Sequence, residues 1–258
     1  LMCHHPPEYM IINDTDKLLM VMRPYQIYAT QALVKQALET ANNAYVWHGT
    51  GSGKTLTSFK TAQILARHPY IKKVVFVVDR QDLDAQSVEE FNKFEQNAVD
   101  TTDKTSTLMK QFRDENNTLI VTTVQKLYRA IVKERYAERL EHLKDEKIIF
   151  IVDECHRTQF GDMNMEIRRF FNRAQYFGFT GTPRFTQNAG PGGQITGDIF
   201  GRCVHNYLLK NAISDNNVLG FSVEYIKTFD GQYDEDDNEQ VYGIDTQEIF
   251  EDDARIEL

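Results

Sequence analysis

The octapeptide at residues 48–55, His-Gly-Thr-Gly-Ser-Gly-Lys-Thr, constrains the fold of this chain more than any other feature. Three glycines fall within five positions, and inside a helix or strand each would cost about 0.5–1 kcal/mol relative to alanine. The apolar residues 44–47 precede the octapeptide, and a helix-forming stretch follows it. A glycine loop between a strand and a helix N-terminus directs backbone amides at an anion, so the pattern predicts a P-loop that binds a nucleoside triphosphate.

Each position of this loop has an expected role. Lys54 should reach the β- and γ-phosphates of ATP, and the Thr55 hydroxyl should ligate Mg²⁺. His48 stands where Gly or Ala is usual, and a bulkier residue there changes the entry to the loop without removing its amides. The alternative, a flexible glycine turn, would not require Gly-Lys-Thr at its end. The residues expected to bind the nucleotide are Thr50, Gly51, Ser52, Gly53, Lys54 and Thr55.

Short apolar runs alternate with helical patterns along the chain. The runs are residues 44–47, 74–78, 118–123, 148–152 and 174–180. Helical spacing or composition marks residues 23–41, 83–94 and a segment containing Leu127 and Ile131, whereas the glycine-rich residues 188–197 predict a loop. This alternation predicts an α/β fold, a mostly parallel sheet with helices on both faces. Functional side chains should gather at the carboxyl ends of its strands.

Two carboxylates end the run at residues 148–152 and complete the expected site. We expect Asp153 to hold Mg²⁺ opposite Thr55, and Glu154 to polarise and orient the attacking water. Lys54, Asp153 and Glu154 are therefore the predicted catalytic residues. The alternative is that the two acids cap the next helix.

The net charge of −9 is concentrated at one end of the chain. Residues 230–258 carry twelve acids and one base, a charge of −11, which leaves +2 for residues 1–229. A nucleic-acid partner is therefore compatible with the acidic composition. Three widely spaced cysteines suit a reducing cytoplasm, and no apolar run of 18 residues predicts a membrane span.

Several motifs together resemble the RecA-like motor lobe of superfamily 2 helicases and translocases. Residues 23–26 resemble its adenine-recognition element, which implies nucleotide binding by Arg23 and Gln26. Residues 48–55 resemble motif I, residues 153–156 a DEAD-box type of motif II, and residues 180–183 motif III. The resemblance implies that His156, Thr180 and Thr182 couple hydrolysis to movement on nucleic acid. For His156, packing in the core is the alternative.

Two further segments resemble the strand-contacting motifs Ia and Ib of this superfamily. A translocase contacts mainly phosphates and does not read sequence. For Arg80 and Lys126, a solvated surface position is an equal alternative. The residues that the resemblance assigns to DNA contact are Arg80, Gln86, Thr122, Thr123, Gln125 and Lys126.

Within the superfamily, the details resemble the motor (R) subunit of type I restriction endonucleases. Trp47-His48 before the loop, residues 153–157 and residues 178–183 carry this resemblance. It implies ATP-driven translocation of double-stranded DNA, with methylation and specificity subunits as partners. We expect a lead-in segment at residues 1–22, the first motor lobe at 23–226 and an acidic connector at 227–258.

The resemblance also predicts low activity for this chain alone. The family's second lobe supplies an arginine to the transferring phosphoryl group, and such an arginine contributes roughly 10³–10⁵ in rate in other nucleotidases. We expect neither that lobe nor the family's nuclease domain within these 258 residues. Weak ATP binding and very slow hydrolysis should result.

Other functions fit less of the sequence. A superfamily 2 motor of DNA repair or replication restart would share every motif quoted. A P-loop kinase or nucleotide switch would leave Gln26, residues 153–156 and residues 180–183 without a common purpose. A purely structural DNA-binding module would need neither Lys54 nor Asp153.

Overall fold

The computed structural model of this chain describes residues 9–13, 18–78, 105–155, 162–190 and 193–218. The chain divides into two compact units, Leu1–Tyr207 and Leu208–Leu258. In the second unit, the described structure is helix α10 (Leu209–Ser214). The domain boundaries predicted from the sequence remain predictions.

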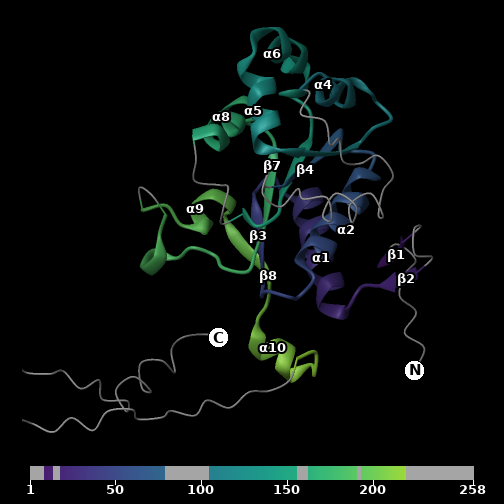
Figure 1. Ribbon diagram of the computed structural model, residues 1–258, viewed down its shortest axis with the longest axis vertical. Coiled ribbons are helices and arrows are strands. Elements are labelled where there is room, and N and C mark those ends of the chain that lie inside the picture. Colours follow the sequence, from purple (N-terminus) through teal and green to yellow (C-terminus); the bar gives the residue numbers. More distant parts are fainter. Residues whose placement is uncertain (1–8, 14–17, 79–104, 156–161, 191–192, 219–258) are drawn as a thin grey trace, which may run out of the picture. The chain divides into compact units, whose positions relative to one another are not determined.

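The first unit is built on a parallel six-stranded sheet (Figure 1). Its strand order is β5-β4-β6-β7-β3-β8, so β7 separates the strand before the glycine loop from the strand before the two acids. All of its strand pairs are parallel, and Val46 of β3 lies beside Phe179 of β7. The strands are β3 (Ala44–His48), β4 (Lys73–Val78), β5 (Leu119–Thr123), β6 (Ile148–Val152), β7 (Gln175–Thr180) and β8 (Arg202–Tyr207).

Helices cover both faces of the sheet, because alternate strand residues point to opposite sides. Val74 and Phe76 of β4 pack in one core cluster with Leu33 of α1 (Pro24–Glu39) and Phe59 of α2 (Lys54–Ala66). Val75 and Val77 belong to the cluster on the other face. Four of the helices that contribute to that second cluster are α4 (Thr105–Arg113), α5 (Val124–Val132), α6 (Glu134–Leu140) and α8 (Asp162–Phe170). In Figure 1 these four helices gather in the upper part of the view.

The predicted fold class and the five predicted strands are confirmed. The predicted loop at residues 188–197 is partly wrong. Helix α9 (Thr196–Phe200) begins inside that range, where the Thr196 hydroxyl accepts a hydrogen bond from the Arg184 amide at 2.8 Å. A short 3₁₀ turn, η3 (Thr186–Asn188), overlaps its start, and another, η2 (Glu141–Leu143), precedes β6. The helix expected at residues 83–94 lies outside the described residues.

A small hairpin precedes the main sheet, within the predicted lead-in segment. Strands β1 (Met10–Asn13) and β2 (Leu18–Val21) pair antiparallel. The buried Lys60 ammonium of α2 donates to the Met10 carbonyl at 2.8 Å. In the part of the chain that the structure describes, no helix has the length and apolar character needed to cross a membrane.

Candidate functional site

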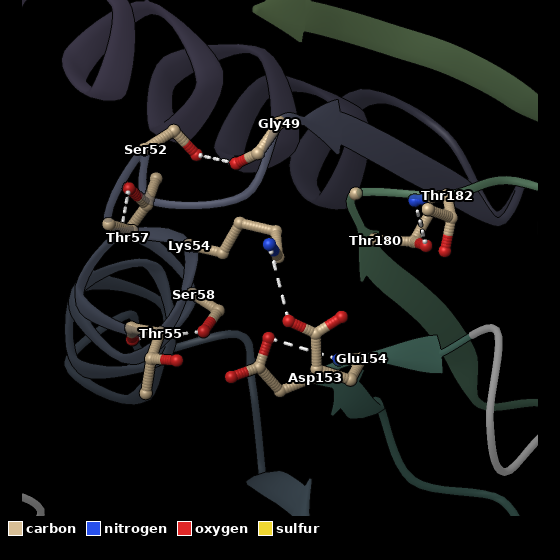
Figure 2. A network of polar contacts seen from close by, with 12 residues as sticks. Gly49, Ser52, Lys54, Thr55, Thr57, Ser58, Asp153, Glu154, Thr180 and Thr182 are labelled. Carbon is tan, nitrogen blue, oxygen red and sulfur yellow. Dashed lines mark hydrogen bonds and ion pairs between the residues drawn. The ribbon is translucent and has the colours of Figure 1, made fainter.

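The glycine loop lies between β3 and the N-terminus of α2, as the sequence predicts (Figure 2). The Gly49 amide donates to the Tyr207 carbonyl of β8 at 2.9 Å. The Ser52 hydroxyl and amide donate to the Gly49 carbonyl at 2.7 and 3.3 Å. These bonds close the loop above the first turn of α2, where unpaired helix amides favour an anion.

Gly53 and Gln26 fit each other closely at the start of α2. Gly53 has φ +73°, and a Cβ at this position would lie 2.8 Å from Gln26 Nε2. Gln26 is buried and donates to the Ser52 and Gly53 carbonyls at 3.3 and 3.4 Å. Its Oε1 accepts from the amide of Arg23, the exposed N-cap residue of α1, at 2.8 Å. In the structure Gln26 therefore supports the loop, and its reading of the base stays a prediction.

Lys54 and the two acids of β6 converge at the carboxyl edge of the sheet (Figure 2). The Lys54 ammonium, 7% exposed, lies 3.2 Å from Glu154 Oε1. Asp153 is buried and accepts a hydrogen bond from the Thr55 side chain. Burial raises the pKa of the Asp153 carboxyl from 3.8 to about 6, opposed by that hydrogen bond. The four predicted residues of the catalytic and metal sets thus come together from two separate strand–loop units.

Glu154 has a backbone conformation that is unusual for its residue type. Its φ is +44°, in the left-handed region that non-glycine residues rarely adopt. Its amide donates to Asp153 Oδ1 at 3.1 Å. Such strain persists only where the surroundings impose it, often at functional sites. Here the strained residue is the one whose carboxylate pairs with Lys54.

The residues after β7 lie against the loop. A Cβ on Gly181 would lie 3.2 Å from Lys54 Nζ and from the His48 carbonyl oxygen, so a side chain there would crowd the loop. The Trp47 indole donates to the Gly181 carbonyl at 3.1 Å. The Thr182 amide donates to Thr180 Oγ1 at 3.1 Å. The contacts of Gly181 place its neighbours Thr180 and Thr182, the predicted coupling residues, beside the nucleotide loop, and their role stays a prediction.

A cluster of rings lies beneath the loop entry. His48 is fully buried, and its Nε2 lies 3.0 Å from His205 Nδ1 of β8. The rings of Tyr25 and Tyr207 stack at 3.6 Å, and the Tyr25 hydroxyl donates to the Ser52 carbonyl at 2.7 Å. Burial is the main cause that lowers the pKa of His48 to about 3, and it also lowers the pKa of His205. Both imidazoles are therefore neutral at pH 7.

The contributions of this ring cluster were not predicted from the sequence. The motifs that contain Tyr25 and Trp47 assign them no contact with the loop, and no sequence pattern links His205 or Tyr207 to His48. An unusual residue at the first loop position, His48, was the available signal. Buried ring nitrogens need partners, and the structure supplies one for His48 Nε2 from a strand 157 residues away. His48 Nδ1 is buried without a hydrogen-bond partner.

The residues present fit Mg²⁺ as a cofactor. The Thr55 hydroxyl and the Asp153 carboxylate, already hydrogen-bonded to each other, offer the oxygen ligands that Mg²⁺ prefers. Among the described residues, no group of three His, Cys, Asp or Glu side chains could hold a metal by itself. A pair of protein oxygens suits an ion that takes its other ligands from phosphates and water.

The predicted DNA-contacting residues that the structure describes lie at the carboxyl end of β5. Thr123 is the N-cap of α5, and its Oγ1 accepts from the Lys126 amide at 3.3 Å. Thr122 Oγ1 and Gln125 Oε1 are buried without a hydrogen-bond partner. Lys126 is buried, which excludes the solvated surface position. Arg80, Gln86 and His156 lie outside the described residues.

The family model and the curated relatives that match this chain describe related proteins. The model of the SWI2/SNF2 ATPase family matches residues 25–255. The chain is 57% identical, over 251 residues, to the endonuclease subunit of the type I restriction enzyme SsaAORF53P from Staphylococcus saprophyticus, covering 97% of this chain and 27% of that protein. It is 44% identical to a Mycoplasma pneumoniae protein described as the C-terminal part of such a subunit, covering 59% of this chain and 80% of that protein. The chain thus spans about a quarter of the length of its first full-length relatives.

Solved structures agree on the fold. The helicase domain of Pyrococcus furiosus Hef superposes with a TM-score of 0.57 at 20% identity, covering 84% of this chain and 43% of that chain. The type ISP restriction-modification enzyme LlaBIII, bound to DNA, superposes with a TM-score of 0.53 at 14% identity, covering 81% of this chain and 17% of that chain. These likenesses confirm the predicted RecA-like lobe.

Proposed function

The chain belongs to the endonuclease (R) subunits of type I restriction enzymes and contains a SWI2/SNF2 ATPase domain, and from this premise we propose that it is the ATP-binding motor lobe of such a subunit. In the full enzyme, this lobe would couple ATP hydrolysis to translocation of double-stranded DNA and thereby to cleavage. The single observation that carries the proposal is the meeting of Lys54, Thr55, Asp153 and Glu154 at one edge of the sheet.

These side chains divide the work of phosphoryl transfer. The Lys54 ammonium would neutralise charge on the β- and γ-phosphates, and Thr55 and Asp153 would hold Mg²⁺. When bound, that ion would neutralise charge that develops on the phosphate oxygens. Glu154 would orient the attacking water and accept its proton.

The Lys54–Glu154 ion pair implies that the nucleotide must bind before Glu154 can act on water. At 3.2 Å the ammonium and the proposed base neutralise each other. A triphosphate tail carries more negative charge than one carboxylate, so it competes for the same ammonium. Binding of the nucleotide would thereby release the Glu154 carboxylate to act on water.

Hydrolysis by this chain alone should be slow. The proposed mechanism needs an arginine from the second motor lobe, and such a residue contributes roughly 10³–10⁵ in rate where it has been measured. Robust DNA-stimulated turnover by this chain would contradict this part of the proposal.

Contacts with DNA would come from the carboxyl end of β5. Thr122 Oγ1 and Gln125 Oε1 are buried polar atoms without partners, and such atoms are costly unless a ligand satisfies them. Thr123 and Lys126 adjoin them, and Arg80 and Gln86 complete the proposed set. The methylation and specificity subunits would be the protein partners, and the cytoplasm the location.

Binding of a fluorescent ATP analogue to Lys54→Ala tests the nucleotide site. Hydrogen bonds to charged groups contribute about 1.5–3 kcal/mol, so we expect about 10- to 100-fold weaker binding. Lys60→Ala is the control, because Lys60 is also a buried lysine of α2 but bonds the hairpin instead. Equal affinity of Lys54→Ala and the parent chain would remove the basis of the proposal.

A further inference from the structure

A cleft of about 270 Å³ lies between α4 and α6, away from the nucleotide site. Met109 and Tyr136, both buried, form its apolar lining. Four exposed cations also line it, two from each helix, and we call it the basic cleft. These cations are Lys110, Arg113, Arg135 and Arg139.

Each wall of the basic cleft brings two cations close together, although α6 also carries Glu134 and Glu138 outside the cleft lining. Lys110 and Arg113 are three residues apart on α4, and Arg135 and Arg139 are four apart on α6. Like charges at these spacings destabilise a helix by roughly 0.2–0.5 kcal/mol per pair. Among the described residues, no carboxylate lines the cleft or forms an ion pair with any of the four. An anionic ligand would convert this repulsion into attraction.

Helix dipoles explain only part of this arrangement. Lys110 and Arg113 lie in the last turn of α4, and Arg139 in the last turn of α6, where cations are favoured. Arg135 lies in the first turn of α6, where the dipole disfavours a cation. Its guanidinium lies 4.6 Å from the centre of the Tyr136 ring and donates to the Tyr136 hydroxyl at 2.9 Å. These two contacts hold the Arg135 cation over Tyr136, at a helix position that the dipole does not favour.

The chemistry of the cleft favours phosphate groups. Three of its four cations are arginines, whose planar guanidinium binds phosphate through paired hydrogen bonds. Its volume of about 270 Å³ lies below the roughly 300–1,000 Å³ of small-molecule pockets, so a whole nucleotide would fit poorly. Exposed cations over an apolar lining suit individual phosphates of a polymer, contacted without sequence reading.

The position of the cleft distinguishes it from the contacts proposed at β5. The Lys73 ammonium, at the first residue of β4, donates to the carbonyls of Gln111, Asp114 and Asn117 at 2.5–3.3 Å. These bonds fix the end of α4, with Arg113, at the amino edge of the sheet. Thr122 and Thr123 lie at the opposite, carboxyl edge. The two edges are separated by the length of β5, five residues or roughly 16–17 Å.

We propose that the basic cleft is a second binding site for the phosphate backbone of duplex DNA, a statement that rests on the proposed function. Because β5 is the edge strand of the sheet, a duplex running along it would pass both sites. The length of β5, roughly 16–17 Å, is close to half a helical turn of B-DNA, whose full turn is about 34–36 Å. The cleft would then add phosphate contacts to the track without adding specificity.

Salt-dependent binding of a mixed-sequence duplex of about three helical turns tests this site. The variants are Lys110→Gln with Arg113→Gln, and separately Arg135→Gln with Arg139→Gln, so that each wall is tested alone. The control is Lys35→Gln with Arg67→Gln, which removes two exposed cations, one on α1 and one at the C-cap of α2. It matches the Lys110, Arg113 variant residue type for residue type. Circular dichroism and thermal melting confirm that each variant is folded.

We expect each cleft variant to lower the slope of log Kobs against log salt by about one to two, since each phosphate contact contributes about 0.9. Affinity near 0.1 M salt should fall about tenfold or more, with little change in the control. If the cleft variants have the same salt slope and affinity as the control, the inference is overturned. In that case, a lowered salt slope for Lys126→Ala would still support the proposed function. If the parent chain binds no duplex, the DNA part of the proposed function fails, and the cleft inference fails with it.

Inorganic pyrophosphate separates a backbone site from a site for free phosphates. Calorimetry in a Lys54→Ala background removes the contribution of the glycine loop. We expect no saturable binding there. Binding that disappears in the Arg135→Gln, Arg139→Gln variant would assign the cleft to a free phosphate ligand and overturn the backbone assignment.

Discussion

The glycine loop and the acidic end of β6 face each other across β7, and they are stabilised in opposite ways. Around the loop, neutral groups bond one another within the protein: His48 Nε2 with His205, Tyr25 with Ser52, and Gly49 with Tyr207. His48 Nδ1, by contrast, is buried without a hydrogen-bond partner. At the end of β6, a carboxylate is buried at the cost of a raised pKa, and Glu154 adopts a left-handed backbone. The loop therefore has its shape without a ligand, whereas the acidic half becomes favourable only with cations. Contacts within the protein stabilise the loop half, whereas burial of the Asp153 carboxylate and the left-handed Glu154 destabilise the acidic half.

The largest loss of stability is expected for a substitution on the loop side. His48→Ala removes a fully buried ring with three aromatic neighbours and a hydrogen bond. We expect the free energy of unfolding to fall by about 3 kcal/mol, near the lower end for buried aromatic truncations. Urea denaturation measures it. His205→Ala, at a half-buried position, is the comparison and should cost about 1 kcal/mol. Equal, small losses would show that the ring cluster does not support the loop.

The pH dependence of stability sharpens the same contrast. The pKa of His48 is lowered from 6.5 to about 3 in the folded chain, so the unfolded state binds a proton first as pH falls. The stability contributed by neutral His48 is complete above 6.5 and is lost progressively below it. Between pH 7 and pH 5 the loss should be about 2 kcal/mol. His48→Gln should remove this part of the slope, and an unchanged slope would contradict the buried, neutral histidine.

For Asp153, on the acidic side, we expect stability to change with pH in the opposite direction. The pKa of Asp153 is raised from 3.8 to about 6, so its stabilising contribution is complete below 3.8 and is lost as pH rises through 6. Asp153→Asn should therefore raise the free energy of unfolding at pH 8 by about 2 kcal/mol, and change little at pH 4. The same variant should lose the Mg²⁺ dependence of nucleotide binding. A destabilised Asp153→Asn at pH 8 would show that the acidic half is structural.

The contrast also explains what the sequence could predict. Residues 48–55 and the acids after β6 are found because each is a local pattern, a buried strand followed by a characteristic loop. The support of the loop is not local. Strand β8 has no apolar run, since most of its residues are exposed or half-buried, so neither the strand nor its contact with His48 was predicted. Gln26 was assigned from its motif, but its amide bonds depend on the loop's carbonyl positions, which only the folded chain defines.

The smallest effect expected belongs to a single hydroxyl. Tyr25→Phe keeps the ring stacked on Tyr207 but removes the 2.7 Å hydrogen bond to the Ser52 carbonyl. A bond of this kind contributes about 1 kcal/mol, so stability should fall by about that amount. If the loop is held in its binding shape by these contacts, binding of an ATP analogue should weaken about fivefold as well, measured by fluorescence anisotropy. Loss of stability with unchanged affinity would instead mean that the nucleotide itself imposes the loop conformation. The two halves of the site would then both be shaped by the ligand, and the contrast between them would disappear.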